Sequence, residues 1–240
     1  MIWQGREPHA WAQAWGVPLV EVYATIGSTN DRALELASER RGEPAVVIAE
    51  EQTAGRGRRG ARWQSPPGGG LWMSVVLPAS RPSRHASLLV GLAVAEAIEA
   101  VAPEVQVGIK WPNDLLLRGG KLGGILCESA GAAVVAGIGI NLRSTTLPQR
   151  ATSLEAECGK VFAPSDLAGS IIGALSGRSL ELDAVSAREL EARDALLGAL
   201  VVTEEHGTGV ARGIDASGAL VLERPDGSRV SVVAGSVRVP

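Results

Sequence analysis

Three glycines and three arginines fill the six residues from Gly55 to Gly60, in a chain whose net charge is −3. Glycine permits positive φ angles and close backbone approach, while the planar guanidinium of arginine matches carboxylate and phosphate groups. The segment therefore predicts a loop that wraps an anionic small molecule. A solvated basic surface loop is the alternative that these six residues alone leave open.

The spacing of this segment also matches G-x-G-x-x-G, the Rossmann dinucleotide fingerprint. That fingerprint requires a helix after the glycines, but the stretch from Trp63 to Gly70 contains adjacent prolines and three glycines, which cannot open a helix. No acidic residue follows about 20 residues later to hold a ribose. A P-loop is excluded as well, because Gly-Lys-Ser/Thr is missing.

Polar residues gather at three other places. Ser28 to Asp31 has the spacing of a capping box, and these residues favour a helix cap over direct contacts to a polar ligand. Lys110 to Asp114 is a turn by default, with Asn and Asp following Pro. Lys121 lies beside Gly123 and Gly124, which would let a ligand or backbone approach closely.

Short apolar runs and amphipathic patterns predict the elements that must position these residues. A hairpin with its turn at Gly119-Gly120 is expected to carry Lys121. The predicted strands are 18–25, 45–50, 71–77, 105–111, 115–117, 121–126 and 134–141, and the predicted helices are 8–15, 28–37, 87–101, 165–175 and 185–197.

Five further β-rich runs follow, at 200–203, 209–214, 219–223, 230–233 and 237–239, separated by tight turns. Their number and length predict a small β-barrel of SH3-like size. We therefore expect an α+β chain with two domains, 1–197 and 198–240.

Composition limits the function classes. A pI near 5.7 argues against broad binding of DNA or of a membrane surface, since both need a basic face. Cys127 and Cys158 lack metal-ligand spacing and are expected to be reduced and structural. The residues from Met1 to Arg6 show no signal peptide, and the apolar stretch from Ala132 to Ile140 is too short to span a bilayer. A cytoplasmic protein is expected.

Together these motifs resemble those of the biotin protein ligases, from about residue 22 to residue 239. The matching motifs are Ser28-Thr29-Asn30, 52–60, Trp63, 110–114, 121–126, 137–141 and 212–215. The resemblance implies a mixed β-sheet with flanking helices, of the class II synthetase-like kind, followed by a small SH3-like domain.

The resemblance also implies a reaction in two steps. Biotin and MgATP give biotinyl-5′-adenylate and pyrophosphate, and the biotin then passes to one lysine of a biotin carboxyl carrier domain. Physically, a carboxylate that attacks the α-phosphate approaches another anion, so cations must neutralise both.

Site residues follow from the resemblance, position by position. The biotin-binding set is Ser28, Thr29, Asn30, Gln52, Gly55, Arg56, Gly57, Arg58, Lys121, Gly123 and Gly124. The ATP-binding set is Arg58, Arg59, Trp63, Lys110, Asn113, Lys121 and Asn141, with Trp63 as the base-stacking platform. The catalytic set is Lys121, Arg56, Arg58 and Asp114. Asp114 is the candidate base for the second step, a structural turn being its rival, and no Mg²⁺ ligand is assigned.

Some alternatives and departures accompany this interpretation. The Ser28 motif begins too early to leave room for the helix-turn-helix domain of repressor-type members, so no operator binding is expected. A lipoate or octanoyl protein ligase and a noncatalytic nucleotide-binding regulator are the rival functions. Ser236 stands where the family usually has an acid. A monomer and a homodimer both stay open, and the loop from Gly55 to Gly60 is predicted to be mobile without ligand.

Overall fold

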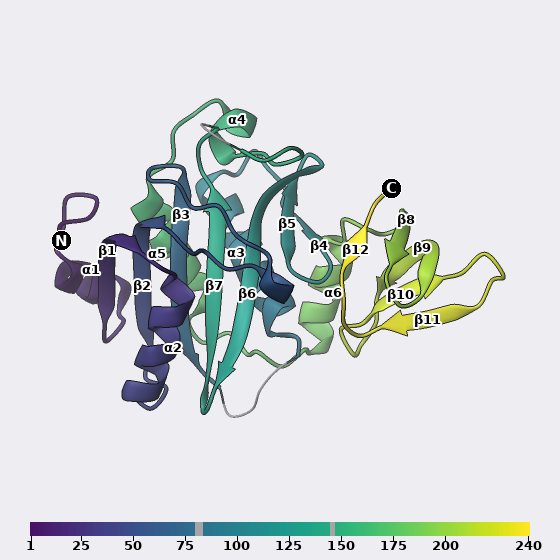
Figure 1. Cartoon of the computed structure of the whole chain (residues 1–240), viewed down its shortest axis with the longest axis horizontal. Coiled ribbons are helices and arrows are strands. Elements are labelled where there is room, and N and C mark those ends of the chain that lie inside the picture. The colour runs from purple at the N-terminus through teal and green to yellow at the C-terminus, as the bar shows by residue number, and fades with distance from the viewer. Residues whose placement is uncertain (80–83, 145–146) are drawn as a thin grey trace.

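The computed structural model describes residues 1–79, 84–144 and 147–240. Its larger part is a seven-stranded sheet with helices on both faces, and a five-stranded antiparallel sheet adjoins one edge of it (Figure 1). Together they confirm the expected mixed sheet with flanking helices. No helix in the described ranges has the length and apolar content that a bilayer span needs.

The large sheet has the strand order β1-β2-β3-β7-β6-β5-β4. Its first two strands are parallel, and all other neighbours are antiparallel. The central strands β2, β3 and β7 are buried along most of their length because helices cover both faces. The strands are β1 (Val20–Ile26), β2 (Ala45–Gln52), β3 (Gly70–Pro78), β4 (Gly108–Lys110), β5 (Asp114–Leu117), β6 (Gly120–Ala130) and β7 (Ala133–Asn141).

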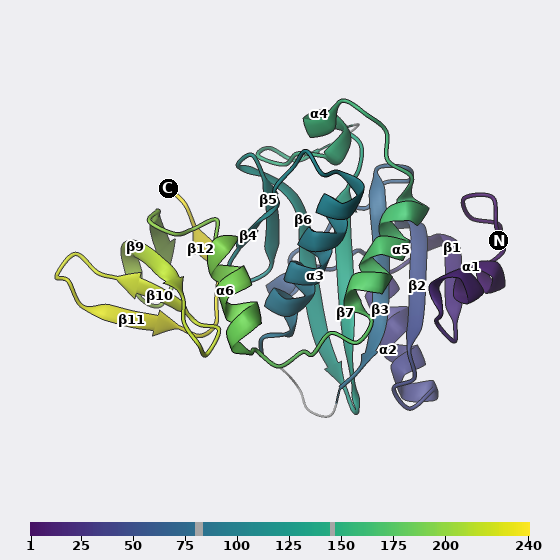
Figure 2. The ribbon, with the colours of Figure 1, turned by 180° about the vertical axis from the view of Figure 1, so that it is seen from behind.

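Helices α3 and α5 pack side by side on one face of this sheet (Figure 2). Helix α2 packs on the opposite face, against β2, β3 and β7, and leaves most of β6 on that face uncovered. The helices are α1 (Pro8–Trp15), α2 (Thr29–Glu39), α3 (Ala86–Val101), α4 (Leu154–Cys158), α5 (Pro164–Leu175) and α6 (Ala184–Ala192).

Two local predictions were wrong, and one helix was missed. The β5–β6 hairpin turns at Arg118-Gly119, both with positive φ, and Gly120 already pairs with Leu117. Helix α6 ends at Ala192 because the following residues bond to the backbone of Ile109. Helix α4 was not predicted.

The small sheet has the order β11-β10-β9-β8-β12, all antiparallel. Its strands are β8 (Leu200–Thr203), β9 (Gly207–Ile214), β10 (Leu220–Glu223), β11 (Arg229–Val232) and β12 (Val237–Arg238). The five predicted strands are confirmed. Among the described residues no pairing joins β11 to β12, so the expected closure into a barrel is not seen.

Both cysteines are free, as predicted. Burial raises the pKa of the Cys127 thiol to about 12, which makes this thiol unreactive near neutral pH.

Candidate active site

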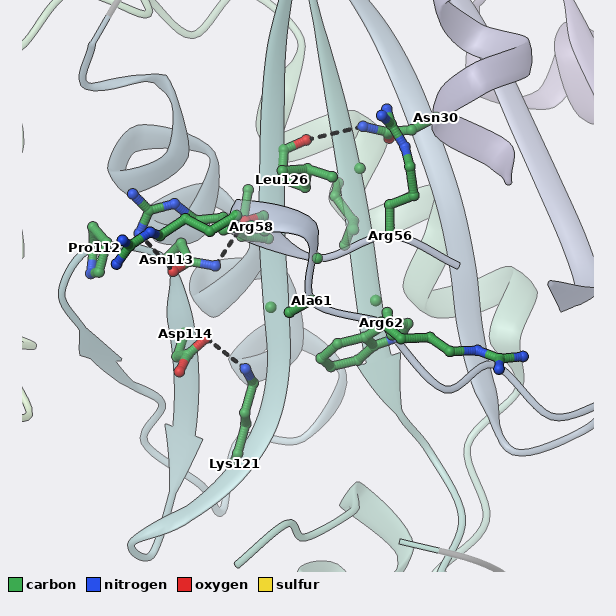
Figure 3. A pocket seen from close by; sticks show the side chains of 18 of the residues that line it. Asn30, Arg56, Arg58, Ala61, Arg62, Pro112, Asn113, Asp114, Lys121 and Leu126 are labelled. Atoms are coloured by element: carbon green, nitrogen blue, oxygen red, sulfur yellow. Dashed lines mark hydrogen bonds and ion pairs between the residues drawn. The ribbon is translucent and has the colours of Figure 1, made fainter. Parts of the chain in front are cut away.

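The segment between β2 and β3 crosses the face of the large sheet that α2 leaves uncovered (Figure 3). A cavity of about 240 Å³ lies between this segment and the sheet. The predicted site residues that line it are Ser28, Thr29, Asn30, Gln52, Arg56, Gly57, Arg58, Arg59, Trp63, Lys110, Asn113, Asp114, Lys121 and Gly124. Residues that are far apart in the sequence thus meet in one cavity.

The sheet side of the cavity is built from glycines. Gly124 of β6 and Gly137 and Gly139 of β7 all line it. A Cβ atom at Gly137 would lie 2.2 Å from Asn30 Oδ1, and one at Gly139 would lie 2.6 Å from the Trp63 ring. Sequence reasoning gave Gly137 and Gly139 no site role. Their alternation within a buried strand is the signal that predicts close approach.

A buried hydrogen-bond network holds one end of the cavity. Gln52 Oε1 accepts from the backbone amide of Thr29 at 2.8 Å and from its hydroxyl at 3.0 Å. Asn30 Oδ1 accepts from the buried Ser74 hydroxyl at 2.7 Å, and its amide donates to the Leu126 carbonyl. These contacts fix the side chains of Thr29, Asn30 and Gln52 before any ligand binds.

The helix-cap interpretation of Ser28 was wrong in its chemistry. Ser28 occupies the N-cap position of α2, but its side chain makes no capping hydrogen bond. It is 3% exposed and lines the cavity. Asp31, the other end of the supposed capping box, pairs with Arg56 at 3.1 Å.

The two arginines of the predicted catalytic set, Arg56 and Arg58, are held at opposite sides of the cavity. Arg56 pairs with Asp31 and Glu128, close to α2. Arg58 donates to Asn113 Oδ1 and to the Gly235 carbonyl, each at 3.3 Å. Burial lowers the pKa of Arg58, yet an arginine stays charged in a protein. A partly buried cation is thus available beside the cavity.

The β5–β6 hairpin supplies a lysine and a carboxylate in contact. Lys121 Nζ lies 2.7 Å from Asp114 Oδ1, and Lys110 Nζ lies 3.9 Å from Asp114 Oδ2. The hairpin register shifts between Leu115 and Leu116, and such irregularities re-aim side chains. Two ammonium groups therefore surround one carboxylate.

A second cavity of about 620 Å³ adjoins the first. Both are lined by Trp63, Lys110, Asp114 and Lys121, so these residues form a shared wall. Asn141 lines only the second cavity, and its amide donates to the carbonyls of Lys121 and Thr152. Asn141 therefore also holds the backbone of Lys121 in place.

The structure does not bring every predicted residue into the cavities. Gly55 packs against the backbone of Trp63 within the loop, where a Cβ would lie 2.5 Å from the Trp63 carbonyl. Gly123 faces the opposite side of the sheet, since its Cβ would lie 2.6 Å from Ile140 Cδ1. Arg59 lines the first cavity, but its guanidinium pairs with Glu204 of the small sheet at 2.6 Å.

A metal centre built by the protein alone is not seen. Within the described ranges, no group of three or more His, Cys, Asp or Glu side chains is arranged to hold a metal ion. Asp114 is the only carboxylate among the described residues that line the two cavities.

Comparison with known proteins identifies the class. A model of the biotin/lipoate A/B protein ligase family matches residues 22–144, and a model of the biotin protein ligase C-terminal domain matches residues 198–239. The chain belongs to the biotin protein ligase family.

Individual relatives agree with this assignment. Biotin–acetyl-CoA-carboxylase ligase of Paracoccus denitrificans is 36% identical, over 86% of this chain and 95% of its own length. The enzyme of the same name from Mycobacterium tuberculosis is 37% identical, over 91% and 88%. The solved structure of biotin protein ligase from Aquifex aeolicus with biotin and ATP superposes with a TM-score of 0.79 at 26% identity, covering 92% of this chain and 99% of that one.

Proposed function

We propose that this chain joins biotin to ATP as biotinyl-5′-adenylate and then transfers biotin to one lysine of the carrier domain of a biotin-dependent carboxylase. The observation that carries the proposal is the wall that the two cavities share. A reaction between two bound molecules needs its reacting atoms where their sites meet, and Lys110, Asp114, Lys121 and Trp63 stand there. The relatives named biotin–acetyl-CoA-carboxylase ligase support the choice of substrates.

In the first step, biotin occupies the smaller cavity and ATP the larger one. The fixed polar groups of Thr29, Asn30 and Gln52 bind the polar end of biotin, and its tail lies along the glycine surface. A biotin carboxylate oxygen attacks the α-phosphorus, and pyrophosphate leaves. Lys121 and Arg58 neutralise the two approaching anions, which is the main electrostatic barrier to this step.

Mg²⁺ enters with ATP in this proposal. Magnesium keeps several of its waters and binds through one or two carboxylates together with substrate phosphates, so a site with one lining carboxylate fits it without a protein cage. When bound, the ion would neutralise charge on the departing pyrophosphate. We place no protein ligand on it beyond Asp114 as the available group.

In the second step, the carrier lysine attacks the acyl carbon and AMP leaves. A free lysine amine has a pKa near 10.4, so only about one in a thousand is neutral at physiological pH. A base beside the mixed anhydride would raise that fraction locally. We propose Asp114 for this role, since it lines both cavities next to Lys121.

One assay tests the function directly. The chain is incubated with biotin, MgATP and a carrier domain, and the mass of the carrier is measured. We expect a single biotin addition. Octanoate or lipoate in place of biotin tests the lipoyl ligase alternative, and binding of biotin and ATP without carrier modification would show a noncatalytic regulator.

We further propose that residues 1–197 and 198–240 are separate domains and that the protein works in the cytoplasm. The two family models, which match 22–144 and 198–239, support the division. The oligomeric state stays open between monomer and homodimer. The loop from Gly55 to Gly60 is predicted to exchange its amide protons rapidly until biotin binds, and equally slow exchange with and without biotin would contradict this.

A further inference from the structure

Residues of the small sheet contact the loop between β2 and β3 at one side of the first cavity. Arg59 donates to Glu204 Oε2 at 2.6 Å, and its guanidinium lies 3.5 Å from the Ser236 hydroxyl. Ser236 in turn donates to Glu204 Oε1 at 3.2 Å. Glu204 follows β8, and Ser236 precedes β12. One carboxylate thus joins two segments of the small sheet to the loop.

Arg58 and Arg59 are neighbours that bind in different directions. Arg59 has φ +56, in the left-handed region that only a few non-glycine residues adopt. Its side chain reaches Glu204, while Arg58 reaches Asn113 and the Gly235 carbonyl. The contact between Arg59 and Glu204 therefore also holds in place the backbone that orients Arg58.

We infer that Glu204 is a positioning residue of the ligase reaction, which holds the loop closed over the activated intermediate through Arg59. This inference rests on the proposed function, because the intermediate is the biotinyl-adenylate. Glu204 itself lines neither cavity among the described residues, so it acts on the reaction through Arg59 and the loop.

The charge state and exposure of the Arg59–Glu204 pair suit a contact that forms and breaks reversibly, which we call the latch. The hydrogen bond from Arg59 lowers the pKa of Glu204, so the carboxylate is ionised throughout the neutral range. The two side chains are 54% and 53% exposed, which makes the pair weak and open to screening by salt. A loop that must open for substrates and for the carrier lysine needs a contact of this strength.

The test compares Glu204→Gln with Glu205→Gln. Glu205 is the next residue in the same turn, is 75% exposed, and its carboxylate lies near His206. Each protein is loaded with chemically prepared biotinyl-5′-adenylate, and release of the adenylate is followed over time. We expect release to be about 1.5- to 5-fold faster in Glu204→Gln, as an exposed ion pair predicts, and unchanged in Glu205→Gln.

Three further measurements separate positioning from general stability. Added salt should speed release more in the unsubstituted protein than in Glu204→Gln, because only the former has the exposed Arg59–Glu204 pair to screen. The double variant Glu204→Gln with Ser236→Glu should restore slow release, because position 236 already lies near Arg59. Amide exchange of residues 55–60 in the adenylate-loaded protein should rise in Glu204→Gln alone.

Equal release from the two single variants, or loop exchange unaltered by Glu204→Gln, would overturn the inference. Because the adenylate is supplied ready-made, the result does not depend on its synthesis by the chain. A protein that retains the supplied adenylate in the expected order but never modifies a carrier would refute the proposed function and leave the latch standing.

Discussion

Replacing Asp114 by Asn separates two roles that the geometry allows for this carboxylate. Asn has nearly the same shape and can still accept a hydrogen bond from Lys121, but it carries no charge and cannot take up a proton. In the structure Asp114 is 19% exposed and Lys121 Nζ lies 2.7 Å away. Any contribution that depends on the negative charge is therefore lost without opening a cavity.

The expected magnitudes differ between the two half-reactions. A hydrogen bond between charged groups contributes about 1.5–3 kcal/mol, so weaker anchoring of Lys121 should slow adenylate formation at most about 10- to 100-fold. Transfer to the carrier loses the same anchoring and also the general base, which contributes a further 10²- to 10⁴-fold, roughly. Transfer should thus be the more sensitive step by at least about two orders of magnitude.

Single-turnover measurements test this ratio. Adenylate formation is followed by pyrophosphate release from biotin and MgATP, and transfer is followed by the mass of a carrier domain added to protein preloaded with synthetic adenylate. Asp166→Asn, in the first turn of α5, serves as a matched control for lost charge outside the cavities. Equal losses in both half-reactions would refute the base and leave Asp114 as an anchor for Lys121.

Three other substitutions follow from the structure. Arg58→Gly should release the adenylate and let it modify bystander lysines, and within this chain the expected adduct is at Lys160, because Lys110 and Lys121 line the cavities. Peptide mass spectrometry showing no such adduct would count against retention of the adenylate by Arg58. Gly139→Ala should raise KM for ATP about tenfold by displacing Trp63, whereas Gly173→Ala, with no atom within 4 Å of its added Cβ, should leave it unchanged. Glu99→Gln should cost about 2 kcal/mol of unfolding free energy at pH 7, measured by chemical denaturation.

The pH dependence of the Glu99 effect has a defined sign. Burial raises its pKa, but hydrogen bonds from Arg193 and the Val107 amide outweigh burial and leave the pKa below its usual value. The contribution is therefore present above the unfolded pKa of about 4.3 and is lost as pH falls through the lower folded value. The two proteins should converge in stability in acid; a constant difference down to pH 2 would contradict the assignment.

The sequence predicted the strands and helices whose burial is continuous. Strands β2, β3 and β7 are runs of apolar residues between glycines and prolines, and α3 carries an apolar stripe that its burial confirms. Helix α4 was missed because it has only five residues, too few for a periodic pattern. The β5–β6 turn was misplaced by one residue because Arg118 adopts positive φ, a conformation that the residue type arginine does not predict.

The membership of the site was more predictable than its geometry. Most of the predicted site residues line the two cavities, but the faces of Gly123 and Gly124 depend on pairing register, and a hairpin irregularity sets that register. The contact of Arg59 with the small sheet depends on its left-handed backbone conformation. Its partner Glu204 is distant in sequence and lies in a turn without a motif, so only the folded chain reveals the pair.

The distribution of site residues along the chain also matters during synthesis. Domains generally fold from the N-terminus onward, so Lys121 and Asp114 can be in place before residue 235 has been added. The Gly235 carbonyl and the Ser236 hydroxyl then secure Arg58 and Arg59 last. We expect a stop codon at position 234 to yield an enzyme that releases the adenylate too early. The released adenylate should then biotinylate lysines of many cellular proteins. Probing lysates of such cells with labelled streptavidin would show this.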